Sequence, residues 1–82
     1  MNKWYVINTK PNSELIAVQK LKRHNYNVYC PTYISIVKHA RKMRKIIKPL
    51  FPGYLFICLD IQKDPWTPIN YMIGVKKLLS DG

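Results

Sequence analysis

The pattern of apolar residues is most informative at residues 54–59, YLFICL, where every position is apolar. Side chains of a β-strand alternate between its two faces, so the odd positions share one face and the even positions share the other. A strand that is apolar on both faces needs cover on both. We expect the aliphatic set, Leu55, Ile57 and Leu59, to pack beneath helices. The set that includes Tyr54 and Phe56 is then expected to form an open aromatic surface, because tyrosine tolerates an interface.

The residues before this strand predict a strand and an amphipathic helix. Trp4–Ile7 has β character and is followed by Lys10-Pro11-Asn12, which stops it. Ser13 is the expected N-cap of the helix, and Glu14 occupies the first turn, where the helix dipole favours an acid. The helix is expected to end near Asn25 with a basic outer face. Its expected inward stripe consists of Leu15, Ala17, Val18 and Leu21.

The middle of the chain predicts two strands and a basic hairpin. Tyr26–Tyr33 has β character, with Pro31 indicating an edge or a bulge. Ile34–Val37 continues as a strand into Lys38–Lys48, where six of eleven residues are Lys or Arg. Because like charges repel in a compact fold, we expect this segment to form the tip of a protruding hairpin. A short basic helix is the alternative.

The C-terminal part predicts a second short helix and a last strand. Thr67 is the expected N-cap, Pro68 the first helical residue and Gly74 the end of the helix. Val75–Leu79 is the last strand. The order is β-α-β-β-β-α-β, or βαββαβ if the middle strands run together. It predicts an α+β fold: an antiparallel sheet with two helices on one face, a ferredoxin-like variant with a protruding basic hairpin. We expect residues 1–82 to form a single domain.

The net charge of +10 indicates that the domain binds a partner. Fourteen Lys and Arg residues face four acids. Such a field favours a polyanion partner, most often nucleic acid. A membrane surface and a merely solubilising role are the alternatives.

The remaining chemistry points away from catalysis. The acids are scattered, and no Ser or Cys is spaced with a His as a nucleophile requires, so we expect no enzyme activity and no cofactor. Cys30 and Cys58 are expected to be buried free thiols, and no Cys/His cluster predicts a metal site. No stretch is long and apolar enough for a signal peptide or a membrane span. We therefore expect a cytoplasmic protein with no membrane partner.

Two families with an open aromatic sheet resemble this sequence. Gly53–Ile57 and Tyr5–Asn8 are similar to the two signatures of the RNA-recognition motif, which stacks bases of single-stranded RNA on its sheet. Pro52, Leu55 and Leu59 depart from that pattern.

A longer resemblance covers Trp4 to Gly82. It is carried by Trp4-Tyr5, Pro31, the basic hairpin and the run LFPGYLFI at residues 50–57, and the later residues Trp66, Ile69 and Gly74-Val75 extend it. This series resembles the N-terminal domain of the NusG family of transcription elongation factors. The gap-free spacing and the run from Pro49 to Pro52 look closer to the RfaH-like antiterminator branch, whereas Gly53 and Trp66 look more like general NusG.

The resemblance implies a partner and a set of binding residues. A domain of this family would dock an apolar patch on the β′ clamp helices of bacterial RNA polymerase and suppress pausing. The matching patch residues are Phe51, Pro52, Tyr54 and Phe56, and Thr67 matches part of a polar motif that contacts the opposite side of the polymerase cleft.

The resemblance also implies contact with DNA of the transcription bubble. Lys10 and Arg23 match the family's DNA-contacting residues, and Lys20 and His24 occupy such positions with other residue types. Lys42 is a further candidate for DNA binding, because the charge of the basic hairpin should attract upstream DNA or the polymerase's own acidic surface. The family's C-terminal KOW domain is not in these 82 residues, so we expect a C-terminally truncated N-terminal domain.

Overall fold

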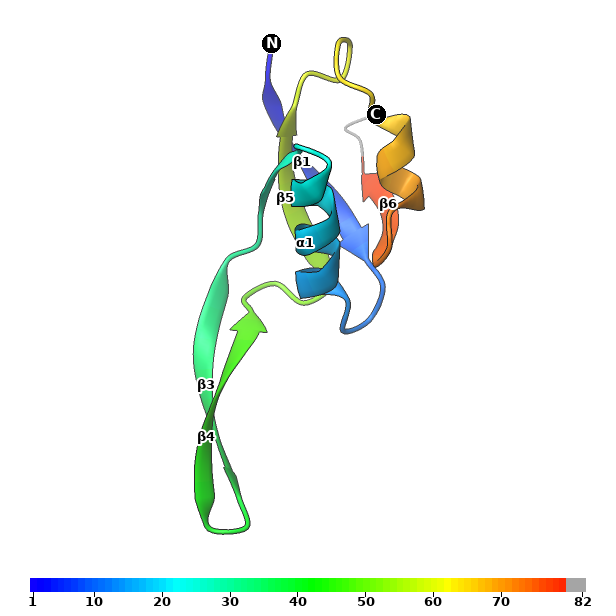
Figure 1. Cartoon of the computed structure of the whole chain (residues 1–82). Helices are drawn as coiled ribbons and strands as arrows, with labels where there is room; N and C mark the ends of the chain where they lie inside the picture. The colour runs from blue at the N-terminus through cyan, green and yellow to red at the C-terminus, as the bar shows by residue number, and fades with distance from the viewer. Residues whose placement is uncertain (80–82) are drawn as a thin grey trace.

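A computed structural model describes residues 1–79 and contains a four-stranded antiparallel sheet and a separate two-stranded sheet (Figure 1). The four-stranded sheet has the order β2-β5-β1-β6, and the two-stranded sheet pairs β3 with β4. The elements in chain order are β1 (Lys3–Thr9), α1 (Glu14–Arg23), β2 (Asn27–Tyr29), β3 (Thr32–His39), β4 (Lys42–Pro49), β5 (Tyr54–Leu59), the 3-10 helix η1 (Thr67–Tyr71) and β6 (Val75–Leu79).

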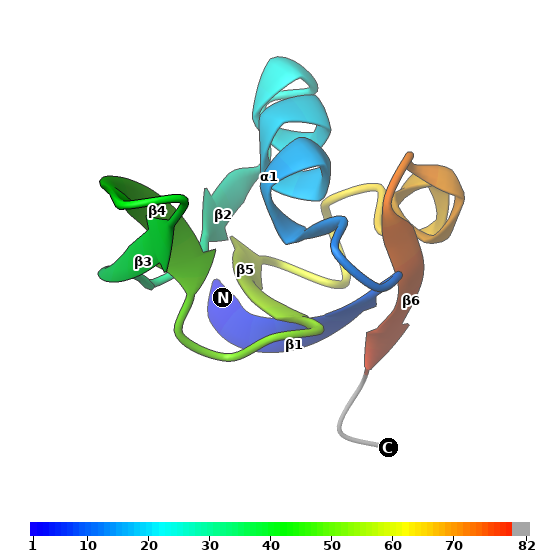
Figure 2. The same ribbon diagram turned by 90° about the horizontal axis from the view of Figure 1, so that it is seen from below.

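The centre of the sheet confirms the predicted division of the apolar strand. On β5, Leu55 and Ile57 are fully buried and Leu59 is 2% exposed, whereas Tyr54 is 42% exposed. α1 lies over the face that carries the buried set (Figure 2). The core consists of Ile7, Ala17, Leu21, Val28, Leu55, Ile57, Leu59, Ile69 and Val75.

α1 begins where the sequence predicted, but its buried stripe is narrower than expected. Ala17 and Leu21 are fully buried and Val18 is half-buried. Leu15 is 50% exposed, so its placement in the core was wrong. Residues four apart lie on one line of a helix, and here Ala17 and Leu21 form that line, which leaves Leu15 to one side. The Ser13 hydroxyl donates to the carbonyl oxygen of Pro11 and makes no capping bond to the helix.

The predicted second α-helix is wrong. The segment is a five-residue 3-10 helix, η1, whose N-cap is Trp66 rather than Thr67. The described residues therefore contain one α-helix, and the expected ferredoxin-like pair of helices on one face does not form. The space between Pro68 and Gly74 is too short for a stable α-helix. Met72 is already extended and Gly74 has φ +87°, so the chain turns directly into β6.

The predicted basic hairpin is confirmed, and the alternative of a basic helix is wrong. β3 and β4 pair over their whole length and project from the four-stranded sheet (Figures 1 and 2). Ala40 and Arg41 form a two-residue turn with φ 50° and 66°, the left-handed values that a type I′ hairpin turn requires. The projection makes the molecule 53 Å long and 23 Å by 21 Å across.

Candidate functional site

The sheet face opposite α1 carries a cluster of aromatic side chains from three strands. The register sets Trp4 of β1 opposite Cys58 of β5, and Val6 opposite Phe56. On the other side of β5, Tyr29 of β2 is opposite Phe56. Directly opposite residues point to the same face of an antiparallel pair. Trp4 and Tyr29 therefore stand on the face that α1 leaves open.

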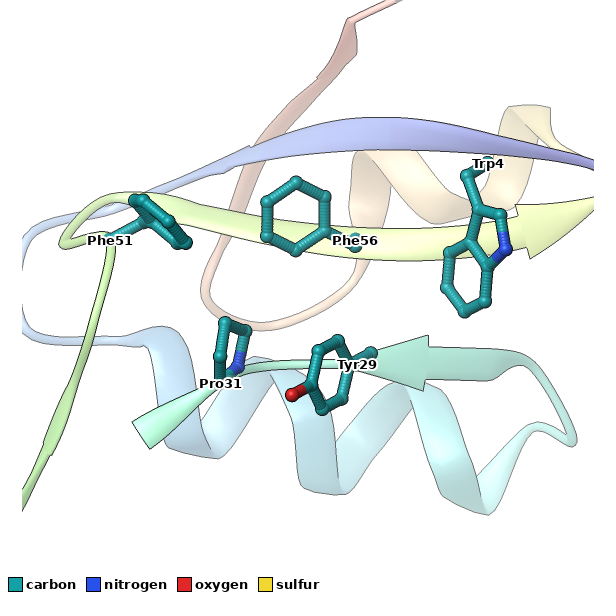
Figure 3. Close-up of a pocket in the computed structure, with 5 residues that line it drawn as sticks. All are labelled: Trp4, Tyr29, Pro31, Phe51 and Phe56. Atoms are coloured by element: carbon teal, nitrogen blue, oxygen red, sulfur yellow. The ribbon is translucent and has the colours of Figure 1, made fainter. Parts of the chain in front are cut away.

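These aromatic side chains line a shallow groove, which we call the aromatic groove (Figure 3). Its volume is about 410 Å³, and its lining residues are Trp4, Tyr29, Pro31, Phe51 and Phe56. Phe51 reaches the groove from the loop before β5, and its ring meets that of Phe56 edge to face, with centroids 5.9 Å apart and planes at 84°. This geometry is the favourable one for two aromatic rings. The groove is thus a packed but accessible apolar surface.

A buried carboxylate holds the loop that presents Phe51. Gly53 has φ +87°, and its N–H donates to Glu14 Oε2 at 2.8 Å. The Gly53 carbonyl accepts from the Thr9 N–H at 2.8 Å, and Tyr54 N–H donates to the Phe51 carbonyl at 3.1 Å. Glu14 is only 7% exposed. The sequence predicted Glu14 as an acid favoured by the helix dipole, and this longer-range role was missed.

The structure brings together only some of the residues predicted to bind polymerase. Phe51 and Phe56 meet in the aromatic groove, and Tyr54 lies on the same face opposite Asn8. Pro52 instead lines a separate groove between α1 and the base of the hairpin. Thr67 is exposed at the start of η1, outside both grooves.

Tyr29 is a groove residue that the sequence prediction missed. It is 57% exposed, the same as Trp4 to within 1%. The sequence signal was the alternation of Asn27, Val28 and Tyr29, because Val28 points to the opposite face from Tyr29. In the structure only Val28 is buried. The sequence prediction used Trp4 only as evidence of the family resemblance and did not name it as a binding residue. Its exposure on the open face also suits it to binding.

The predicted DNA-binding residues fall into two places. Lys20 and Arg23 lie on α1 and His24 is its C-cap, while Lys10 follows β1 and is exposed. α1 has ten residues, which is about 15 Å of helix. Lys42 begins β4 at the far tip of the hairpin, so the structure does not bring it together with the cations of α1.

The two thiols are free, as predicted, but they are half-buried rather than buried. Burial raises the pKa of the Cys30 thiol, and the negative charge of Glu14 raises it further. A thiol with a raised pKa is a poor nucleophile at neutral pH. Within residues 1–79 no group of three His, Cys, Asp or Glu residues could hold a metal ion, and no helix is long and apolar enough to cross a membrane.

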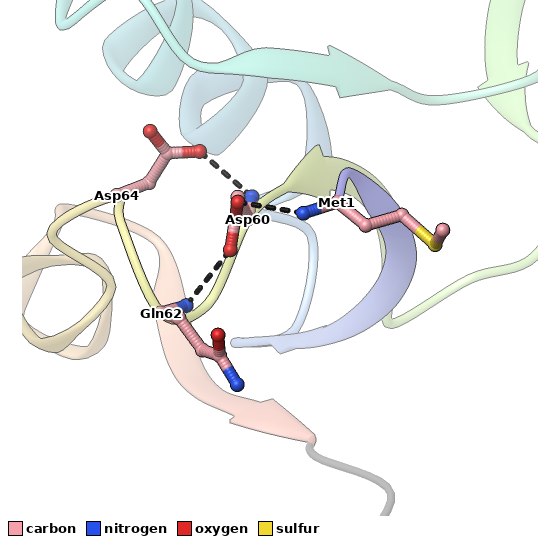
Figure 4. A network of polar contacts seen from close by, with 4 residues as sticks. All are labelled: Met1, Asp60, Gln62 and Asp64. Carbon is pink, nitrogen blue, oxygen red and sulfur yellow. Dashed lines mark hydrogen bonds and ion pairs between the residues drawn. The ribbon is translucent and has the colours of Figure 1, made fainter.

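The acids at the end of β5 serve a structural network (Figure 4). Asp60 accepts hydrogen bonds from the Met1 amine at 2.8 Å and from the Gln62 N–H at 3.0 Å. Its own N–H donates to the Asp64 carboxylate at 2.7 Å. The hydrogen bond from the Met1 amine is the main cause that lowers the Asp60 pKa. These carboxylates close the β5–η1 loop, which explains their position without a ligand.

Comparison with known protein families gives a match that covers nearly the whole chain. The family model described as "Transcription termination factor nusG" matches residues 2–82. The match includes every strand of the aromatic groove, α1 and the basic hairpin.

Proposed function

Because the chain belongs to the NusG family of transcription termination and elongation factors, we propose that the aromatic groove binds RNA polymerase at the β′ clamp helices. The observation that carries this proposal is the gathering of exposed aromatic rings on the sheet face that α1 leaves uncovered. Trp4, Tyr29 and Phe51 are 56%, 57% and 49% exposed. Exposed apolar patches of this kind mark partner sites, and aromatic anchors supply most of the binding energy of an interface.

The other predicted contact residues have distinct places in this proposal. Tyr54 lies along β5 beyond the groove and supplies a hydroxyl at its edge, where a polar rim is expected. Pro52 is exposed in the same loop as Phe51 and would contact the polymerase beside the groove. Thr67 provides a separate polar contact across the polymerase cleft.

We further propose that the cations of α1 contact DNA of the transcription bubble. Lys10, Lys20, Arg23 and His24 would act through phosphates, because charge alone provides that contact without a particular base sequence. Lys42 would reach upstream DNA independently, from the tip of the hairpin. Bridging the polymerase cleft while holding DNA would suppress pausing and favour antitermination, as in the RfaH-like branch. The proposed setting is the cytoplasm, with no catalytic step and no cofactor.

The test of the polymerase contact is a double variant of exposed groove residues, Tyr29→Ser/Phe51→Ser. Both side chains are about half exposed, so the variant keeps the core intact. The matched control is Leu15→Ser/Ile73→Ser, which removes two apolar side chains of similar exposure, 50% and 59%, away from the groove. In a pull-down with bacterial RNA polymerase, the groove variant should lose at least tenfold in affinity, and the control should bind as the unmodified chain does. Equal binding by all three would refute the proposal.

The DNA contact is tested separately by salt dependence. Lys20→Gln/Arg23→Gln should lower the slope of log affinity against log salt by about two on a DNA bubble, because each phosphate contact contributes about one. Polymerase binding by the same variant should not change. An unchanged slope would show that Lys20 and Arg23 of α1 do not contact DNA phosphates.

A further inference from the structure

The basic hairpin differs from the rest of the molecule because neither of its strands has a second neighbour. In the described residues, β3 and β4 pair only with each other. Each strand therefore has an outer edge whose N–H and C=O groups meet solvent, which is an arrangement that accepts a further strand. An isolated two-stranded ribbon is also only marginally stable by itself. A third strand would stabilise it.

The two faces of the hairpin have different chemistry. On β4, Lys42, Arg44, Ile46 and Lys48 share one face, which we call the cationic face because three of these four side chains are charged. Met43, Lys45 and Ile47 lie on the other, which we call the aliphatic face, and there they pair with β3 residues Lys38, Ile36 and Ile34. The exposed aliphatic side chains of this face are Ile34 (65%), Ile36 (60%), Met43 (72%) and Ile47 (60%).

The outer edge of β4 is the better of the two edges for a charged partner. β4 carries four cations, Lys42, Arg44, Lys45 and Lys48, whereas β3 carries only Lys38. Residues 42–48 are all exposed, whereas β3 contains two half-buried residues. No acidic residue occurs between Glu14 and Asp60, so nothing within the hairpin neutralises these charges.

From these observations we propose that the outer edge of β4 binds an extended acidic segment of a partner protein as a third strand. Side chains of an added strand alternate between the same two faces as those of β4. Acidic residues at every second position would meet Arg44 and Lys48, and the aliphatic residues between them would cover Met43, Ile47 and the apolar stem of Lys45. The partner is thus defined by an alternating acidic and aliphatic pattern in an extended chain.

A second copy of this chain is not a suitable partner for the edge of β4. Pairing two β4 strands would place Lys and Arg residues opposite one another, and like charges directly opposite destabilise a strand pair. A nucleic acid would meet the charges of the cationic face but would leave the aliphatic face exposed and the edge N–H groups unpaired. The combination of charge, aliphatic surface and open edge favours the protein strand.

The backbone geometry indicates which amides would take part. Residues that flank a two-residue turn form a hydrogen-bonded pair, and the pairs alternate along the strands. Because the turn is Ala40-Arg41, every second residue of β4, beginning with Met43, directs its N–H away from β3. The amides of Met43, Lys45 and Ile47 are therefore expected to donate to the added strand.

The experiment uses a nine-residue peptide of alternating glutamate and valine, titrated into the full chain and followed by backbone NMR. The proposal expects saturable binding and slower hydrogen exchange at the amides of Met43, Lys45 and Ile47. A peptide of the same composition with its glutamates in one block should bind at least fivefold more weakly. Equal binding of the two peptides, or protection confined to β3, would overturn the proposal.

Two further arms separate a strand partner from simple charge attraction. Arg44→Gln/Lys48→Gln should weaken binding of the alternating peptide about three- to tenfold, the range expected for two exposed charge pairs. The matched control Lys22→Gln/Lys76→Gln removes the same charge from α1 and β6 and should have less than a twofold effect. An equal effect of the two variants would also overturn the proposal. So would slower hydrogen exchange at the amides of Met43, Lys45 and Ile47 on addition of a DNA oligonucleotide that carries the same charge as the peptide.

Discussion

The N–H of Gly53 donates to the carboxylate of Glu14 at 2.8 Å, joining the first turn of α1 to the loop before β5. The two residues are 39 positions apart, and Glu14 is almost completely buried. Two residues before Gly53, Phe51 extends into the aromatic groove. This hydrogen bond therefore couples the helix on one face of the sheet to the binding surface on the other.

Removing the Glu14 carboxylate should destabilise the fold and loosen the loop. Glu14→Ala leaves the partly buried Gly53 N–H without its acceptor, which costs about 1–3 kcal/mol. Urea denaturation measures this loss. Ser13→Ala is the neighbouring control, because the Ser13 hydroxyl makes no cap to the helix, and it should cost less than about 0.5 kcal/mol. If the two variants were equally stable, the Glu14–Gly53 hydrogen bond would not contribute to the free energy of unfolding.

The two glycines with φ +87° should respond differently to alanine. A Cβ at Gly53 meets no atom within 4 Å, so Gly53→Ala incurs only the cost of a left-handed residue, about 1–2 kcal/mol. A Cβ at Gly74 would approach the Ser13 carbonyl oxygen at 3.0 Å and the Ala17 Cβ at 3.1 Å. Overpacking adds about 1–3 kcal/mol, so Gly74→Ala should have the lower free energy of unfolding. The opposite order in thermal or urea unfolding would contradict the close approach of Gly74 to Ser13 and Ala17.

The Asp60 network should make stability depend on acid pH. The folded-state pKa of Asp60 lies below its ordinary value, first because of the Met1 amine and then because of the Gln62 N–H. A lowered carboxyl pKa stabilises the fold above the unfolded value of about 3.9, and that contribution disappears as the pH falls through the folded value. Asp60→Asn should therefore be less stable than the unmodified chain near neutral pH, and the difference should shrink in acid. A difference independent of pH would exclude this linkage.

The Cys30 thiol should react slowly with alkylating reagents. Burial raises its pKa, and the charge of Glu14 adds to the effect, so less thiolate is present at a given pH than in a free cysteine. In a Cys58→Ser background, the rate of iodoacetamide labelling can be measured by mass spectrometry as a function of pH. The rate should rise with pH, but its midpoint should lie at a higher pH than that of a cysteine in a model peptide. Glu14→Gln should move the curve back toward the peptide. A curve at or below that of the peptide would show that the surroundings of Cys30 do not disfavour its thiolate.

The division of β5 into a buried and an open face followed from alternation alone, because the period of a strand assigns each side chain to a face. The basic hairpin followed from charge, since repelling cations separate most easily on a protruding element. Val75–Leu79 was also placed correctly, because Gly74 interrupts the chain immediately before it. These features depend on neighbours in the sequence.

The features that sequence reasoning missed depend on contacts between distant segments. Glu14 binds a loop 39 residues away, and nothing near Glu14 in the sequence indicates that partner. Leu15 fits a helical stripe, yet whether it is covered depends on how α1 sits on the sheet. Tyr29 joins the groove only because β2 pairs with β5. The 3-10 form of η1 follows from the early return of the chain at Met72, which helix start and stop signals do not encode.

The most direct test of the polymerase proposal is site-specific photocrosslinking. A benzoylphenylalanine at position 29, in the aromatic groove, is compared with one at position 71, on η1, in a complex with bacterial RNA polymerase. Both positions are exposed tyrosines, so the probe itself should not disturb the fold. Position 29 should crosslink to the β′ clamp helices, and position 71 should not. Crosslinking of position 29 elsewhere, or equal crosslinking of the clamp helices from both positions, would contradict the proposal.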